Sequence, residues 1–172
     1  MNSPVLNVEK TTDKPFYKYG DIITYRIVLT QEQTGCVARN VTLQDVIDTQ
    51  GVRLLKDSVI LMDEKGNVAD ADVQINDDNT FLMSTGRTLV RDSRYSICDN
   101  DKGGLFEQVM YNPLDCQEQK SMIVEYQAAV IDAALAGQKV HNTAVADSSE
   151  KIPATGETET EVHSPILEIV KE

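Results

Sequence analysis

Short runs in which apolar residues alternate with polar ones recur along the chain, and turn-forming residues separate them. Between residues 21 and 30, every second position is apolar, at Ile23, Tyr25, Ile27 and Leu29. This is the period of a β-strand with one buried face. Similar runs predict strands over residues 37–47, 58–62, 71–75, 80–83, 105–111, 121–131, 139–146 and 157–162. Many short strands without a long amphipathic helix indicate an all-β antiparallel sandwich.

Three segments modify this simple pattern. Residues 130–137 are rich in alanine and end in glycine, but they are too few for a stable helix, so we expect a turn or a single helical turn. Residues from about 60 to 118 have shorter strands and more polar loops, and we expect an elaborated middle region there. The last run alternates Glu and Thr before Val162, which is typical of an exposed edge strand.

The two ends of the chain carry related segments. Residues 3–10 (SPVLNVEK) align with residues 164–171 (SPILEIVK), with four of eight positions identical and two Val-to-Ile exchanges. A repeat this long is a whole domain rather than a unit of a solenoid. We therefore expect one sandwich over residues 1–163, followed over residues 164–172 by a linker and the first strand of another repeat. Lys171 then corresponds to Lys10 and should stay unreacted.

Strand alternation places three polar residues among the buried ones, because side chains repeat every second residue. Lys10, Asp45 and Asn142 each continue the apolar face of their run. Burial lowers the pKa of a lysine and raises that of an aspartate, so both tend toward their neutral forms. A neutral amine is a nucleophile, and a neutral carboxyl can hydrogen-bond an amide oxygen and polarise its carbon. The three residues predict a Lys10–Asn142 isopeptide bond, formed with loss of ammonia and with Asp45 as proton donor.

A purely structural interpretation of these residues stays open. Lys10 could end its strand with the ammonium group in water, Asp45 could cap a turn, and Asn142 could hydrogen-bond the backbone in a corner. Lys14 and Lys18 compete as the reactive amine, although both lie in a polar loop outside the apolar alternation.

The residues from Leu6 to Val46, together with HNTAV at 141–145, resemble the repeat and isopeptide-forming domains of Gram-positive surface proteins and fimbrial subunits. The stretch YKYGDIITY at 17–25 is the most family-like piece. The resemblance implies an immunoglobulin-like sandwich of the collagen-adhesin type. In that type the cross-linking lysine, aspartate and asparagine have the order and rough spacing of Lys10, Asp45 and Asn142. The middle of the chain departs from the family pattern.

The charge balance restricts the partners. The chain has 16 Lys and Arg against 28 Asp and Glu, a formal net charge of −12. Nucleic acids and anionic membranes bind clustered basic residues, and the sequence has no such cluster, so we expect neither partner. Residues 1–20 contain no secretory signal. If the parent protein is extracellular and anchored to the cell wall, as the resemblance implies, its signal and anchor lie outside this sequence.

Cysteine and histidine give weaker signals. Cys98 and Cys116 flank a polar segment and could form a disulfide in an exported protein, with free thiols as the alternative and Cys36 left over. No Cys–His spacing indicates zinc, and His141 and His163 stand alone in the sequence.

Two short segments resemble known functional motifs but lack essential parts of them. Residues 99–104 (DNDKGG) resemble the start of a calcium loop, but the twelfth position is Met110 rather than Glu. Residues 152–156 (IPATG) resemble a sortase signal but lack the apolar span and basic tail that follow one, so we expect a loop between the last two strands.

No nucleophile–base pair or phosphate loop is recognisable in the sequence, so we expect no cofactor, no metal and no enzyme acting on an external substrate. The first functional hypothesis is a stalk domain of a bacterial surface or fimbrial adhesin, with neighbouring repeats as its partners. The second is a module that binds a host protein or glycan through the middle region. An exposed apolar or aromatic patch there would favour binding, and a polar surface would favour the stalk.

Overall fold

The computed structural model describes residues 3–76, 79–92 and 118–164, and in this part of the chain the regular structure is almost entirely β-strand, as expected. The longer strands are β1 (Leu6–Thr12), β3 (Ile22–Gln31), β5 (Thr42–Ile47), β9 (Asp72–Asn76), β10 (Thr80–Ser84), β13 (Ser121–Val130), β14 (Lys139–Asp147) and β15 (Ala154–Val162). The short ones are β2 (Phe16–Tyr17), β4 (Val37–Ala38), β6 (Val52–Leu54), β7 (Ile60–Met62), β8 (Val68–Ala69), β11 (Thr88–Val90) and β12 (Glu118–Gln119). The described residues also form two 3-10 turns, Lys56–Ser58 and Ala133–Leu135.

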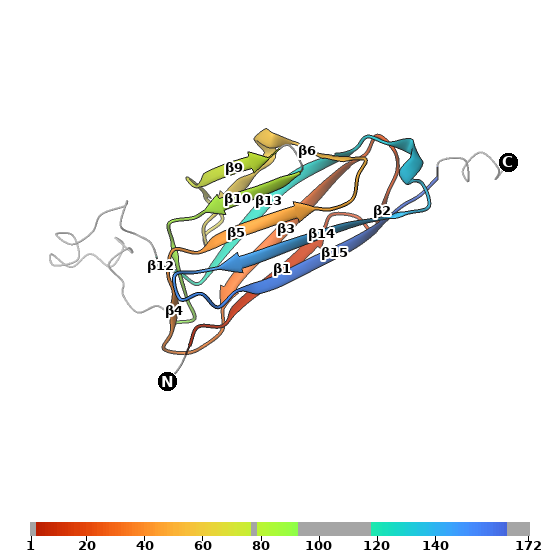
Figure 1. The fold of residues 1–172 in the computed structure, drawn as a ribbon. Coiled ribbons are helices and arrows are strands. Elements are labelled where there is room, and N and C mark those ends of the chain that lie inside the picture. Colours follow the sequence, from red (N-terminus) through yellow and green to blue (C-terminus); the bar gives the residue numbers. More distant parts are fainter. Residues whose placement is uncertain (1–2, 77–78, 93–117, 165–172) are drawn as a thin grey trace.

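Two sheets face each other and form a sandwich (Figure 1). The first has the order β1-β3-β13-β7-β8, with β6 also paired to β13, and the second has the order β2-β15-β14-β5-β10-β9. A small sheet of β12, β11 and β4 lies at one end. Within both large sheets the described neighbours are antiparallel except for β2 and β15, which run parallel.

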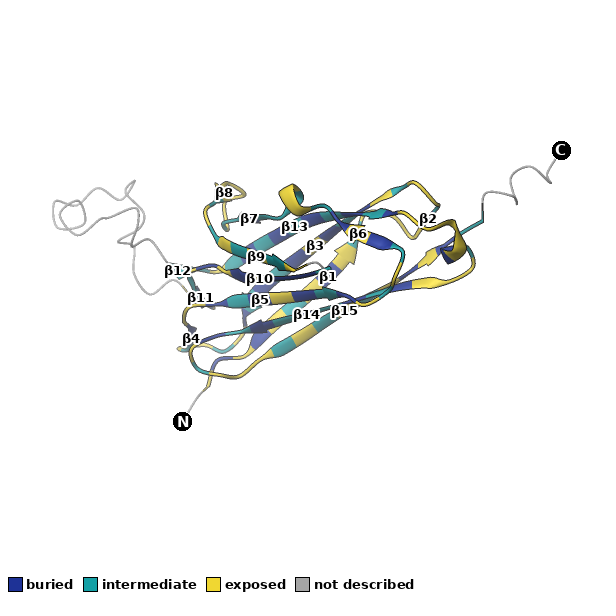
Figure 2. Cartoon of the chain, turned by 45° about the horizontal axis from the view of Figure 1, so that its top comes forward, coloured by how far each residue is buried: buried dark blue, intermediate teal, exposed yellow. Residues whose placement is uncertain are grey.

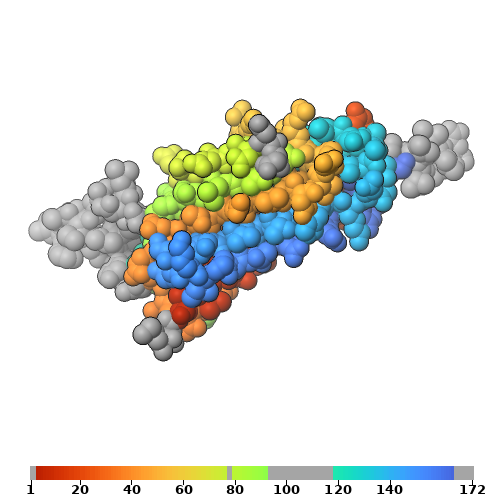
Figure 3. Space-filling view, viewed as in Figure 1, coloured from red at the N-terminus to blue at the C-terminus, as the bar shows by residue number. Residues whose placement is uncertain are grey.

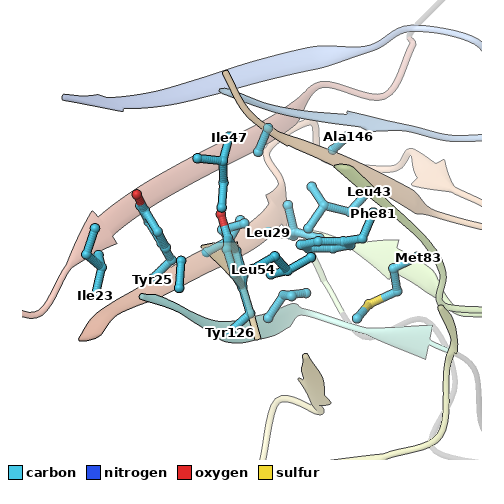
Figure 4. Packing of buried hydrophobic residues seen from close by; sticks show 14 of the residues in the cluster. Ile23, Tyr25, Leu29, Leu43, Ile47, Leu54, Phe81, Met83, Tyr126 and Ala146 are labelled. Atoms are coloured by element: carbon cyan, nitrogen blue, oxygen red, sulfur yellow. The ribbon is translucent and has the colours of Figure 1, made fainter. Parts of the chain in front are cut away.

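The inner faces of the two sheets bury the alternating apolar residues, as Figure 2 shows. The large aromatic side chains Tyr25, Phe81 and Tyr126 are at most 1% exposed and lie near the middle of this core (Figure 4). The alanine-rich segment forms a single 3-10 turn that buries Leu135, so the expected helical turn is confirmed.

One expected strand is interrupted. The run over residues 37–47 is divided into β4 and β5. Between them Asn40 adopts a φ of 50°, a left-handed conformation that asparagine tolerates better than most residues. The Asn40 side chain donates a hydrogen bond to Ser149 at 3.1 Å, and the neighbouring Arg39 pairs with Glu150. Polar contacts with the β14–β15 loop therefore hold the break in place.

The expected loop at residues 152–156 is also wrong in part, because β15 already begins at Ala154. β15 pairs with β14 along its length and with the two-residue β2 only at Glu161 and Val162, so most of it is the edge strand that the sequence predicted, although Thr160 and Val162 are buried. The glycine that suggested a loop has a tertiary role instead. A Cβ atom on Gly156 would lie 2.7 Å from Val8 Cγ1, so only glycine lets β1 approach β15 this closely.

The first and last strands consequently lie side by side and run in the same direction (Figure 1). Val8 contacts Gly156, and further along Phe16 pairs with Glu161, so both residue numbers increase together. No hydrogen-bonded ladder joins β1 to β15 in the described part of the chain. The contact between these two strands, called the seam below, closes one side of the sandwich.

Several sequence-based expectations lie outside the described residues. These are the strand over residues 105–111, the Cys98–Cys116 pair, the calcium-like loop at 99–104 and the repeated segment beyond Ser164. Among the described residues, no helix is long and apolar enough to span a membrane.

Candidate functional site between the two sheets

The structure brings Lys10, Asp45 and Asn142 together inside the sandwich. Lys10 comes from β1 in the first sheet, whereas Asp45 on β5 and Asn142 on β14 come from the second. Asp45 pairs with Ala144 and Asn142 pairs with Ile47, so Asp45 and Asn142 are diagonal neighbours on one face. The alternation of each strand, combined with this register, accounts for their meeting.

A fourth residue, Tyr126 on β13, connects the three. Lys10 Nζ donates to Asp45 Oδ2 at 2.5 Å and to the Tyr126 hydroxyl at 2.7 Å. The Tyr126 hydroxyl donates to Asp45 Oδ1 at 2.6 Å and accepts from Asn142 Nδ2 at 2.6 Å. This hydroxyl thus uses its one proton and both lone pairs, and its oxygen touches every member of the predicted triad.

Aromatic rings enclose the amine. Tyr25 lies directly opposite Tyr126 on the neighbouring strand, and their rings stack with centroids 4.9 Å apart. Lys10 Nζ is 4.7 Å from the centroid of the Tyr25 ring and 4.8 Å from that of Tyr126. Phe81 packs against Tyr126 in a T-shaped arrangement, with ring centroids 5.0 Å apart. Figure 4 shows both tyrosines projecting toward the sheet that carries Ile47.

Burial controls the protonation of the site. The Lys10 side chain is 0% exposed and the Asp45 side chain 1% exposed. Loss of hydration lowers the pKa of Lys10 to about 8, although the Asp45 carboxylate acts in the opposite direction. Burial likewise raises the pKa of Asp45, against the effect of Lys10, and raises the pKa of Tyr126. Burial therefore shifts both groups toward their neutral forms, although Lys10, with a pKa of about 8, is still mostly protonated at pH 7.

One expected contact is replaced by another. We expected Asp45 to hydrogen-bond the amide oxygen of Asn142, but Asn142 Oδ1 is buried without a hydrogen-bond partner. The amide nitrogen instead donates to the Tyr126 hydroxyl, which in turn donates to Asp45. Tyr126 thus connects the carboxyl group to the amide, which also interacts directly with Asp45.

Sequence reasoning did not identify Tyr126 or Tyr25 as part of the site. Both occupy inward positions of their strands, where an aromatic residue is ordinary core. The only signal was their hydroxyl groups, because a buried tyrosine usually has a polar partner.

The competing amines lie elsewhere. Lys14 is exposed and Lys18 half-buried, both in the segment between β1 and β3. His141 is not isolated in three dimensions, because its Nδ1 lies 2.8 Å from Asp48 and its Nε2 lies 2.7 Å from Glu157. These carboxylates raise the pKa of His141. His141, Asp48 and Glu157 lie at the surface, away from the buried network. Among the described residues, no group of three side chains is suited to binding a metal ion.

The fold is that of Gram-positive pilin and adhesin domains. The major pilin BcpA of Bacillus cereus superposes with a TM-score of 0.54 at 10% identity, over 94% of this chain and 40% of the pilin. The pilus 2b backbone protein of group B streptococcus gives 0.54 at 16% identity, over 90% and 56% of the respective chains.

A third similar structure is ACE19, the collagen-binding subdomain of the Enterococcus faecalis surface protein ACE. Its TM-score is 0.50 at 12% identity, over 91% of this chain and 96% of the subdomain. The chain spans less than two thirds of both pilins. No protein-family model and no curated protein sequence matches it significantly. The similarity at these identities is one of fold.

Proposed function

We propose that this chain is a shaft domain of a bacterial surface or fimbrial adhesin, hardened by an isopeptide bond between Lys10 and Asn142. The buried network of Lys10, Asp45, Tyr126 and Asn142 carries the proposal. An amine, a carboxyl and a carboxamide are costly to bury together between two sheets. The reaction of the amine with the carboxamide replaces two of these polar groups with one secondary amide. The shared fold of pilin and adhesin domains supports the cellular role.

The bond would form in one turnover. The neutral Lys10 amine attacks Cγ of Asn142, and the bond from Cγ to Nδ2 breaks. Nδ2 leaves as ammonia, taking up a proton that Lys10 Nζ gives up, so the product is a secondary amide. Asp45 lies 2.5 Å from Lys10 Nζ and is placed to carry that proton.

Polarising the amide requires a donor at its oxygen. A half turn of the Asn142 side chain would exchange Oδ1 and Nδ2 and bring the oxygen to the Tyr126 hydroxyl. With Asp45 neutral, that hydroxyl can accept from the carboxyl and donate to the amide oxygen. Negative charge developing on the oxygen is then stabilised inside a dry core, where such hydrogen bonds are strong.

This function implies neighbouring repeats of the same parent protein as partners and an extracellular location on a wall-anchored chain. The chemistry is a single self-modification rather than turnover of an external substrate.

Intact-mass spectrometry tests the proposal. The purified chain should be lighter than its sequence mass by one ammonia, and a proteolytic digest should contain a branched peptide joining Lys10 to Asn142. Lys10→Ala and Asn142→Ala should each restore the full mass. Lys14→Ala is the matched control and should still lose ammonia. A full mass in the unaltered chain would refute the cross-link.

A second function is favoured by one surface feature. On the outer face of the first sheet, Val28, Ile123, Met62 and Val68 follow one another across β3, β13, β7 and β8. Val68 is 71% exposed, and β7 and β8 belong to the elaborated middle region. An apolar row of this kind suits protein binding. Collagen is the first probe, since one structural neighbour binds it, and Val68→Glu should abolish any binding seen.

A further inference from the structure

Two threonines on β15 lie between the buried network and the protein surface. Thr158 is directly opposite Asn142 in the β14–β15 pairing, and Thr160 is opposite Val140. Residues paired across antiparallel strands project from the same face of the sheet. Both threonine side chains therefore point into the sandwich, and Thr158 is the cross-strand neighbour of the Asn142 amide.

The hydroxyl groups of these two threonines form no hydrogen bond with the described part of the protein. Thr158 Oγ1 and Thr160 Oγ1 are buried without a hydrogen-bond partner, and Thr160 is only 6% exposed. A buried hydroxyl left unpaired costs free energy, and valine would fill the same space without that cost. Together with Asn142 Oδ1 and Tyr25 Oη, they account for four of the seven unpaired buried side-chain atoms in the described residues.

A groove opens at the seam over the same residues. Its volume is about 430 Å³, and it is lined by residues 10–15 on one side and 158–160 on the other. Figure 3 shows the blue atoms of β15 lying against the red atoms of the N-terminal segment on this side of the molecule. Thr158 and Thr160 thus border both the groove and the inner face that carries Asn142.

We propose that Thr158 and Thr160 form the exit path for the ammonia released when Lys10 and Asn142 react. This inference rests on the proposed cross-link. The departing nitrogen is Asn142 Nδ2, which leaves as a neutral molecule that both donates and accepts hydrogen bonds. Thr158 offers the first polar contact outside the network, and Thr160 the next contact toward the groove.

Removal of ammonia gives the reaction its direction. Ammonia held in a closed core remains beside the new amide, where it can attack Cγ and expel Lys10 Nζ, restoring both starting groups. Once it reaches solvent it is diluted and protonated, and the reverse reaction stops. Hydroxyl groups unpaired before the reaction can bind ammonia without first breaking a bond to the protein.

The test follows the loss of ammonia over time in the complete chain. The protein is made by cell-free synthesis and quenched with acid at intervals, and the reacted fraction is read from the intact mass. Thr158→Val should slow the first-order formation of the bond about tenfold, because the departing ammonia loses one hydrogen bond and a loss of that size changes a rate by about this factor. Thr158→Ser, which keeps the hydroxyl, should react at the parent rate. Thr155→Val, an outward threonine on the same strand, is the matched control.

A stability measurement separates this role from a merely structural one. In a Lys10→Met background, where no bond can form, Thr158→Val should leave the melting temperature unchanged or raise it, because an unpaired hydroxyl is lost. An equal rate in Thr158→Val and the parent, or a slower rate accompanied by a lower melting temperature in that background, overturns the exit path. A parent chain that never loses ammonia overturns the cross-link itself, which is a different result.

Discussion

The hydroxyl of Tyr126 donates a hydrogen bond to Asp45 Oδ1 across the space between the two sheets, at 2.6 Å. Through the same oxygen it accepts from Lys10 and Asn142. The protonation of the carboxyl and the orientation of the amide are therefore coupled through one side chain.

This coupling predicts a specific effect of Tyr126→Phe. The ring and its stacking on Tyr25 are kept, but Asp45 and Asn142 each lose a hydrogen bond. We expect bond formation to slow by roughly tenfold or more, and the unreacted protein to lose about 1–3 kcal/mol of unfolding free energy. Timed intact-mass measurements and denaturant unfolding check this. Tyr25→Phe is the comparison, because the Tyr25 hydroxyl interacts with Asn142 but forms no hydrogen bond to Lys10 or Asp45. Its effect should be smaller, and an equal effect of both changes would contradict the argument.

The lowered pKa of Lys10 predicts how the reaction depends on pH. Attack needs a neutral Lys10 amine, and the contact through Tyr126 needs a neutral Asp45. The rate should therefore pass through a maximum, falling at low pH where Lys10 is protonated and at high pH where Asp45 loses its proton. The unreacted fold of Asn142→Ala should also gain stability as the pH rises from about 8 toward 10.5, because in this range the unfolded lysine still binds a proton that the folded one has lost. A rate that keeps rising well above pH 8 would show that a neutral Asp45 is not required for the reaction.

The close approach at the seam predicts the effect of Gly156→Ala. The added methyl group would lie 2.7 Å from Val8 Cγ1 and 2.8 Å from the Val8 carbonyl oxygen, so β1 must move away from β15. Overpacking of this kind costs about 1–3 kcal/mol, and the shift should also displace Lys10 and slow the cross-link. Thr155→Ala, outward on the same strand, should do neither. Thermal unfolding and intact mass measured on both variants decide the matter.

The cross-link itself predicts non-additive losses of stability. Joining Lys10 to Asn142 closes a loop of more than a hundred residues, which by analogy with disulfides stabilises the fold by about 4–5 kcal/mol. Lys10→Met and Asn142→Ala should each lose most of this amount, and the double variant should lose little more because both changes remove the same bond. Losses that add in full would mean that the two residues contribute separately.

Strand alternation in the sequence was sufficient to predict that Lys10, Asp45 and Asn142 face inward, because the period of two follows from backbone geometry alone. It could not identify Tyr126, whose position looks like ordinary core until the register of β13 and the opposing sheet is known. The beginning of β15 was misjudged for a related reason. Gly156 suggests a loop when only its neighbours in the chain are considered. The structure shows that a glycine is needed there because Val8, from the first strand, packs directly against it.

The parallel course of β1 and β15 means that the chain enters the sandwich at one end and leaves it at the other. Tension applied to the two ends would shear β1 along β3, with all the hydrogen bonds of that pair resisting together. A bond from Lys10 to Asn142 would shorten the route of the force, which would pass from β1 directly to β14 and out through β15. Residues 11–141 would then carry none of the load, so the rest of the sandwich could fluctuate or open without lengthening the molecule.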